Sequence, residues 1–144
     1  MKIMTKNEHY LGNPNLKAKG VNLDFTTEQV GEYLKCQQDP IYFIKKYVKI
    51  VHLDRGLINF ELYDFQENIV NTIHENRFVI CKLPRQSGKS TTTIAYLLHY
   101  VLFNSEMSVA ILANKQATAR ELLHRLQLAY EHLPKWLHQG VEQW

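Results

Sequence analysis

Apolar and polar positions form their clearest pattern in residues 77–103. Residues 78–83 are an almost continuous apolar run, with the low alternation expected of a strand that is covered on both faces. A polar loop follows this run. Beyond the loop, apolar residues recur at helical spacing on one face, at Ile94, Leu97, Leu98, Val101 and Leu102. The pattern therefore predicts an interior strand, a tight loop and an amphipathic helix, in that order.

A second apolar run, residues 107–113, predicts another interior strand. The two strands and the helix between them would form a strand–helix–strand unit with a right-handed crossover. A long helix is expected from about residue 116 to Leu133, and a helical turn followed by the start of another strand is one interpretation of residues 134–144. The fold class that this order predicts is α/β, with a mostly parallel sheet and flanking helices.

Capping signals predict two helices upstream of this region. Thr26, with Gln29 three residues later, is a capping-box signal. Asp39 followed by Pro40 is typical of the start of a second helix, because the carboxylate caps free N–H groups and proline fits the first helical turn. Both helices are interpreted as structural.

A hairpin and a further helix are predicted next. Residues 48–53 and 57–62 are rich in β-branched and apolar residues on either side of a turn at 54–56. Asp64 is expected to cap the helix that follows. The expected organisation is thus an N-terminal arm over 1–25, a helical lead-in over 26–55 and the α/β core over 56–144.

Composition and charge narrow the class of protein. The 144 residues include 45% hydrophobic and 22% charged residues, which is ordinary for one globular domain, and the net charge of +3 is too small to argue for nucleic acid by itself. Cys36 and Cys81 are far apart, and the histidines show no metal-ligand spacing. No apolar run approaches the roughly 20 residues of a membrane span. We expect an intracellular, soluble protein without a membrane partner.

The loop between the predicted strand and helix carries the candidate chemistry. Gly88, Lys89 and Ser90 match the end of the phosphate-binding pattern G-x-x-x-x-G-K-[ST], a P-loop, and a strand before and a helix after are the context that this motif needs. Leu83 stands where the pattern has its first glycine, and Pro84 is a candidate to set the turn instead. The alternative is a chance tetrapeptide before an ordinary helix. The flanking elements favour a nucleoside triphosphate site.

Two further groups of polar residues have alternative interpretations. The side-chain amide of Gln66, upstream of the loop, offers the donor and the acceptor needed to read an adenine edge, although a solvated glutamine on a helix surface is the simpler interpretation. The phosphate loop downstream favours adenine recognition. Lys115, Arg120 and Arg125 could contact DNA phosphates, but a charged solvent-facing side is favoured.

Several segments together resemble one known family. The segments are HYLGNPNLK, LYDFQ, CKLPRQSGKSTT, ILANKQATARELLHRL and LPKWLHQGVEQW. In this order they are similar to the N-terminal part of the large terminase subunit of contractile-tailed bacteriophages, the ATPase motor that packages DNA into the prohead. The family's phosphate loop also lacks the first glycine of the pattern. It carries an arginine and a glutamine before the loop glycine, and Arg85 and Gln86 stand at those positions here.

The resemblance implies an α/β P-loop NTPase core and specific residue roles. Lys89 would neutralise the β- and γ-phosphates of ATP, and Ser90 would ligate Mg²⁺. Arg85 matches the arginine that stabilises the transition state, although it could equally hold the loop conformation. The implied ATP-binding residues are Phe65, Gln66, Gln86, Ser87, Gly88, Lys89, Ser90 and Thr91, with Gln66 on adenine and Phe65 as its stacking or packing neighbour.

The resemblance also implies what the chain lacks. The Walker B carboxylate, the water-orienting acidic residue and the nuclease domain would follow Trp144, and later strands would lie between the two predicted here. We therefore expect a partial coding product that is marginal in solution and inactive as a hydrolase alone. The implied partners are double-stranded DNA, the portal protein and a small terminase subunit, with the full-length protein forming a ring at the prohead vertex in the host cytoplasm and absent from the virion.

Two other functions remain open from the sequence. A helicase of superfamily 2 or a restriction-type DNA translocase also places a glutamine motif before a phosphate loop, but usually keeps the first loop glycine. A non-enzymatic binding module, which docks a partner through the N-terminal arm, is the second alternative. Nucleotide affinity and its dependence on Lys89 would separate the binding module from the ATPase.

Overall fold

The fold is built mainly from helices. The computed structural model describes residues 8–52 and 54–144. The first seven residues of the predicted arm, and residue 53 of the predicted hairpin, lie outside the described residues. The elements, in chain order, are η2 (Tyr10–Gly12), α1 (Thr27–Gln38), α2 (Pro40–Tyr47), β1 (Lys49–His52), β2 (Gly56–Asn59), α3 (Asp64–Glu75), α4 (Lys89–Phe103), α5 (Gln116–Glu131) and η3 (Lys135–Leu137).

The caps of the first two helices confirm the prediction from the sequence. The Thr26 hydroxyl accepts from the backbone N–H of Gln29 at 3.2 Å, and the Gln29 side chain accepts from the backbone N–H of Thr26 at 3.0 Å. Asp39 accepts from the backbone N–H of Tyr42 at 3.0 Å, and Pro40 is the first residue of α2. Each cap satisfies N–H groups that a helix leaves without an internal partner.

The predicted hairpin is also present. Strands β1 and β2 pair antiparallel, with Ile50 opposite Ile58. Gly56 opens β2 with a φ of +67°, a left-handed backbone that glycine adopts without steric cost. The hairpin lies beside α2 and α5 and forms one side of the candidate site described below.

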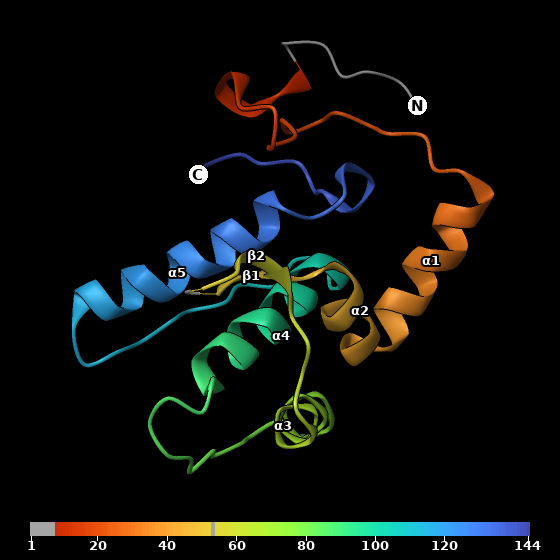
Figure 1. The fold of residues 1–144 in the computed structure, drawn as a ribbon. Helices are drawn as coiled ribbons and strands as arrows, with labels where there is room; N and C mark the ends of the chain where they lie inside the picture. The colour runs from red at the N-terminus through yellow and green to blue at the C-terminus, as the bar shows by residue number, and fades with distance from the viewer. Residues whose placement is uncertain (1–7, 53) are drawn as a thin grey trace.

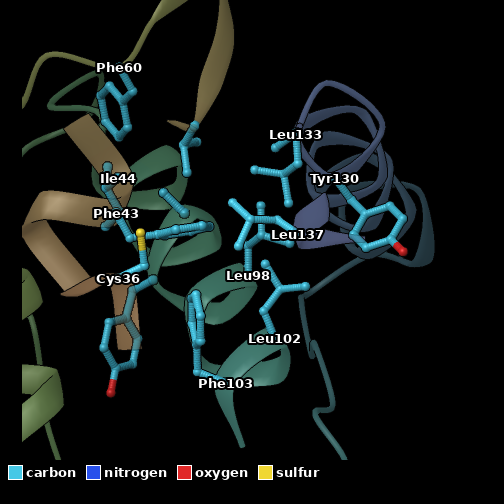
Figure 2. Close-up of a cluster of buried hydrophobic side chains, with 14 of the residues drawn as sticks. Cys36, Phe43, Ile44, Phe60, Leu98, Leu102, Phe103, Tyr130, Leu133 and Leu137 are labelled. Atoms are coloured by element: carbon cyan, nitrogen blue, oxygen red, sulfur yellow. The ribbon is translucent and has the colours of Figure 1, made fainter. Parts of the chain in front are cut away.

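Helix α4 is the centre of the core, because it packs against α2, α3 and α5. Leu98 and Leu102 of α4 are buried, and Figure 2 shows them between side chains from α1 and α2 on one side and from α5 and the C-terminal residues on the other. Of the predicted apolar face, Ile94, Leu98 and Leu102 are buried, but α4 also buries Ala95, Tyr96, His99 and Phe103, so it is covered on more than the one predicted side. Phe43 on α2 is fully buried, with its ring 5.4 Å from that of Phe103.

The predicted α/β fold class, a P-loop core with a mostly parallel sheet, is wrong. In residues 8–52 and 54–144 the only sheet is the two-stranded antiparallel hairpin. Residues 78–83 and 107–113, which the hydrophobic pattern assigned to interior strands, belong to no strand. They lie in the connections before and after α4, which extend from the helical core in Figure 1. Cys81, expected on an interior strand, is exposed.

The reason for this difference is that a strand depends on its neighbours. A helix satisfies its own backbone groups, whereas a strand needs a second strand beside it for its N–H and C=O groups. Within the described part of the chain, neither apolar segment has such a partner, so both remain open to solvent. The side chain of Ile80 is 98% exposed and that of Leu112 is 87% exposed.

The two ends of the described chain contact each other. Ala18 and Val141 form an isolated parallel bridge, in which the N–H of Val141 donates to the carbonyl of Lys17 at 2.8 Å. Leu16 is 1% exposed and belongs to the hydrophobic core. The described part of the predicted arm therefore packs on the C-terminal segment, where η3 is the helical turn expected within residues 134–144.

Candidate nucleotide-binding site

The loop that precedes α4 has the local form of a phosphate-binding loop. Lys89 is the first residue of α4, and Gly88 before it has a φ of +74°. The first N–H groups of a helix have no partner within it, and the helix dipole adds partial positive charge at the same end. The prediction that the loop ends where a helix begins at Lys89 is confirmed. The interior strand expected before the loop is the part that is wrong.

The ammonium group of Lys89 lies across this loop. It donates to the carbonyl of Pro84 at 3.2 Å and to that of Leu83 at 3.4 Å. The Ser87 hydroxyl donates to the same Pro84 carbonyl at 3.1 Å. An anion bound by Lys89 would therefore replace backbone carbonyls as the partner of the ammonium group.

Two residues of the loop have left-handed backbone conformations. Gln86 has a φ of +62°, which is unusual for a residue with a side chain, and Gly88 is the second. Left-handed residues bend successive N–H groups toward one point, and such concave backbone binds anions. A Cβ at position 88 would lie 2.6 Å from the Gln66 side-chain nitrogen, so a larger residue there would have to displace the Gln66 amide as well as adopt a conformation that favours glycine.

Gln66 connects the start of α3 to the loop. Its side chain is buried, its Oε1 accepts from the backbone N–H of Tyr63 at 3.0 Å, and its Nε2 donates to the carbonyl of Ser87 at 3.4 Å. The N-cap position of α3 belongs to Tyr63, whereas Asp64, the predicted cap, is the first helical residue. The sequence predicted a site residue at Gln66 but did not predict its contact with the loop.

A pocket of about 680 Å³ lies between the hairpin, the start of α3 and the loop. Six of the predicted ATP-binding residues line it: Phe65, Gln66, Gln86, Ser87, Gly88 and Thr91. The structure therefore brings Phe65 and Gln66 close to the loop, although helix α3 and the segment after it lie between them in the sequence. This size is within the range of small-molecule sites.

Three predicted site residues do not line the pocket. Lys89 is turned onto the loop carbonyls, Ser90 is exposed as the second residue of α4, and Arg85 is exposed in the loop. A basic residue from α5 comes close instead. Arg125 donates to the hydroxyl of Thr91 at 3.5 Å and forms an ion pair with Glu121 one helical turn earlier.

The pocket also has walls of which the sequence interpretation assigned only Phe65 to the site. Tyr63 and Phe65 stack with their ring centroids 5.9 Å apart and an interplanar angle of 8°, and both are exposed. The hairpin adds His52 and Arg55 to the lining, and the connection from β2 to α3 adds Glu61. In the sequence, the placement of Tyr63 and Phe65 on either side of Asp64 was the pattern that could have indicated this aromatic wall. The hairpin wall had no signal, because it depends on how the hairpin packs.

The side chains with the largest pKa shifts lie away from the pocket. Glu32 of α1 accepts hydrogen bonds from Lys46, Tyr42 and Tyr47, and these lower the pKa of its carboxyl to about 2. Burial lowers the pKa of His99, whose Nε2 donates to the carbonyl of Cys36 at 2.8 Å. These groups join α1 to α2 and α1 to α4, so their role is structural.

No family model matches this chain. Within the described residues, no helix is long and apolar enough to cross a bilayer. No group of three or more His, Cys, Asp and Glu side chains that would hold a metal ion occurs in the same part of the chain.

Proposed function

We propose that the pocket and the loop before α4 bind ATP, and that the chain is the ATP-binding part of a DNA-packaging motor of the large terminase type. The observation that carries the proposal is the placement of Lys89 as the first residue of α4, behind a left-handed Gly88 and beside the pocket of about 680 Å³. Lysine at a helix start after a glycine turn is the arrangement that binds the phosphates of nucleotides.

In this proposal the triphosphate lies on the N–H groups of the loop and the first turn of α4. Lys89 exchanges its contacts with the Leu83 and Pro84 carbonyls for phosphate oxygens, so that the acceptor of its hydrogen bonds becomes negatively charged instead of neutral. Arg125, which already contacts Thr91 at the same helix end, adds a second positive charge nearby. Arg85 keeps its proposed role toward the transition-state charge in the complete motor.

The Ser90 hydroxyl is the residue that would hold Mg²⁺. It is exposed as the second residue of α4, and a hydroxyl oxygen suits this ion. Mg²⁺ in nucleotide sites takes few protein ligands, because phosphate oxygens and waters complete its shell. A metal ion bound there would neutralise phosphate charge.

The base would lie toward the aromatic wall. Phe65 and Tyr63 offer exposed, stacked rings at the edge of the pocket, and Gln66 lines the pocket between them and the loop. Aromatic faces stack on nucleobases without demanding one particular base. Gln66 is then the group that reads the adenine edge.

Hydrolysis and movement of double-stranded DNA belong to the complete motor in this proposal. Phosphoryl transfer needs carboxylates that hold the metal and orient water. Of the residues that line the pocket, only Glu61 is a carboxylate, and it is on the hairpin side. We propose the portal protein, a small terminase subunit and DNA as partners of the assembled ring, at the prohead in the host cytoplasm.

Calorimetric titration of the chain with Mg²⁺-ATP tests the proposal. We expect saturable binding by the unaltered chain and at least about tenfold weaker binding by Lys89→Ala, because a charge-assisted contact to phosphate is lost. Lys115→Ala, which removes an exposed lysine before α5, is the matched control and should bind as the unaltered chain does. A folded chain without affinity for ATP would contradict the proposal and favour a non-enzymatic binding module.

A further inference from the structure

Gln66 makes two hydrogen bonds that belong to different parts of the site. Its Oε1 caps α3 through the Tyr63 N–H at 3.0 Å, and its Nε2 reaches the Ser87 carbonyl in the loop at 3.4 Å. The Gln66 side chain is 3% exposed, and both bonds are part-buried. One side chain thus joins the start of α3 to the loop that leads into α4.

The side-chain amide of Gln66 also lies very close to Gly88. A Cβ added there would lie 2.6 Å from Nε2 of Gln66, well inside contact distance. The Gly88 carbonyl in turn accepts the first backbone hydrogen bond of α4, from the N–H of Thr92 at 2.9 Å. The amide of Gln66 therefore lies against the residue from which α4 begins.

Gln29 provides a comparison within the same chain. It occupies the third position of α1, as Gln66 does in α3, and it accepts from the backbone N–H of its N-cap residue at the same 3.0 Å. Gln29 is partly exposed and contacts no loop of the site. Capping a helix therefore needs only the oxygen of such a glutamine, and the Nε2 contact of Gln66 with Ser87 is an addition.

We propose that Gln66 is a positioning residue that holds the phosphate loop in its binding conformation. The inference rests on the proposed nucleotide site and deepens it. A glutamine amide has two N–H donors and two acceptor positions. After the bonds to Ser87 and Tyr63, one donor and one acceptor remain for a base edge. Gln66 would then serve phosphate binding through the loop and base binding directly.

Binding of tripolyphosphate, which has no base, separates the two roles. We expect Gln66→Met, a neutral change of similar volume, to weaken tripolyphosphate binding by about three- to tenfold, the range for one lost hydrogen bond, and to weaken ATP binding by at least as much, because ATP also loses a contact with its base. Gln29→Met removes the corresponding cap of α1 and should change neither affinity. If Gln66→Met weakens ATP but leaves tripolyphosphate unchanged, the positioning role is wrong and Gln66 acts on the base alone.

Hydrogen exchange without ligand gives an independent measurement. The N–H of Thr92, bonded to the Gly88 carbonyl, should exchange about three- to tenfold faster in Gln66→Met and at an unchanged rate in Gln29→Met. An unchanged rate in Gln66→Met would overturn the inference. If the rate responds but the unaltered chain binds neither ligand, the nucleotide site is wrong and the loop contact stands.

Discussion

The two regions of the molecule that are richest in apolar residues behave in opposite ways. The helical core around α2 and α4 buries its apolar side chains, with Phe43 and Leu98 both at 0% exposure. The segments 78–83 and 107–113 are as apolar as the core helices, yet Ile80 is 98% exposed and Leu112 is 87% exposed. Hydrophobic composition alone therefore does not decide which residues are covered.

The difference lies in what each kind of element needs from its surroundings. Helix α4 closes its own hydrogen bonds and needs only apolar contact, which α2, α3 and α5 supply from several directions. An extended segment needs a partner in register on at least one side. The hydrophobic effect acts on both regions, but only the helices bury their apolar side chains without needing a backbone partner. The extended segments, which have no partner strand, remain exposed.

The largest expected effect is in the core. Leu98→Ala should lower the free energy of unfolding by about 3 kcal/mol, because the leucine is fully buried and its removal leaves a cavity. Urea denaturation followed by circular dichroism would measure the change. A loss below about 1 kcal/mol would show that α4 is not the packed centre of the protein.

A smaller effect is expected from the buried histidine of the same helix. Burial lowers the pKa of His99 below its usual value, and its Nε2 donates to Cys36 while its Nδ1 is buried without a partner among the described residues. As the pH falls below about 6.5, the unfolded chain binds a proton that the folded chain resists. Stability should therefore fall as the pH is lowered toward the folded pKa.

Urea denaturation at several pH values between about 7 and 5 would check this sign. His99→Phe keeps an aromatic ring beside Phe43 and Phe103 and should flatten the pH dependence, whatever it does to the absolute stability. The exposed His124 offers the matched control, because His124→Gln should leave the slope as it is. A steeper slope in His99→Phe would contradict the assignment.

What the sequence predicted correctly is local. The capping pair Thr26 and Gln29, the hairpin and the start of α4 at Lys89 each depend on residues a few positions apart. These features are determined by backbone sterics and short-range hydrogen bonds, which depend on residues close together in the sequence. The hairpin side of the pocket and the loop contact of Gln66 depend on packing between elements, which no local pattern reports.

The prediction of a parallel sheet was wrong because a sheet, too, depends on contacts between distant segments. The apolar runs are typical of covered strands. A strand must be paired and covered by other segments, however, and the described residues provide no pairing strand for either run. The local geometry of the loop was less affected, because it depends mainly on the left-handed Gly88 and on the helix that begins at Lys89.

The smallest expected effect is on the exposed side of the comparison. Ile80→Ser should change the free energy of unfolding by no more than about 0.5 kcal/mol, because a side chain that is 98% exposed gains little from folding. The same denaturation measurement applies, so the result can be set directly beside Leu98→Ala. A loss of more than about 1 kcal/mol would mean that residues 78–83 are covered in solution, by another part of the chain or by a second copy. In that case the contrast between the two apolar regions would no longer hold, and the reason given for the missing sheet would have to be revised.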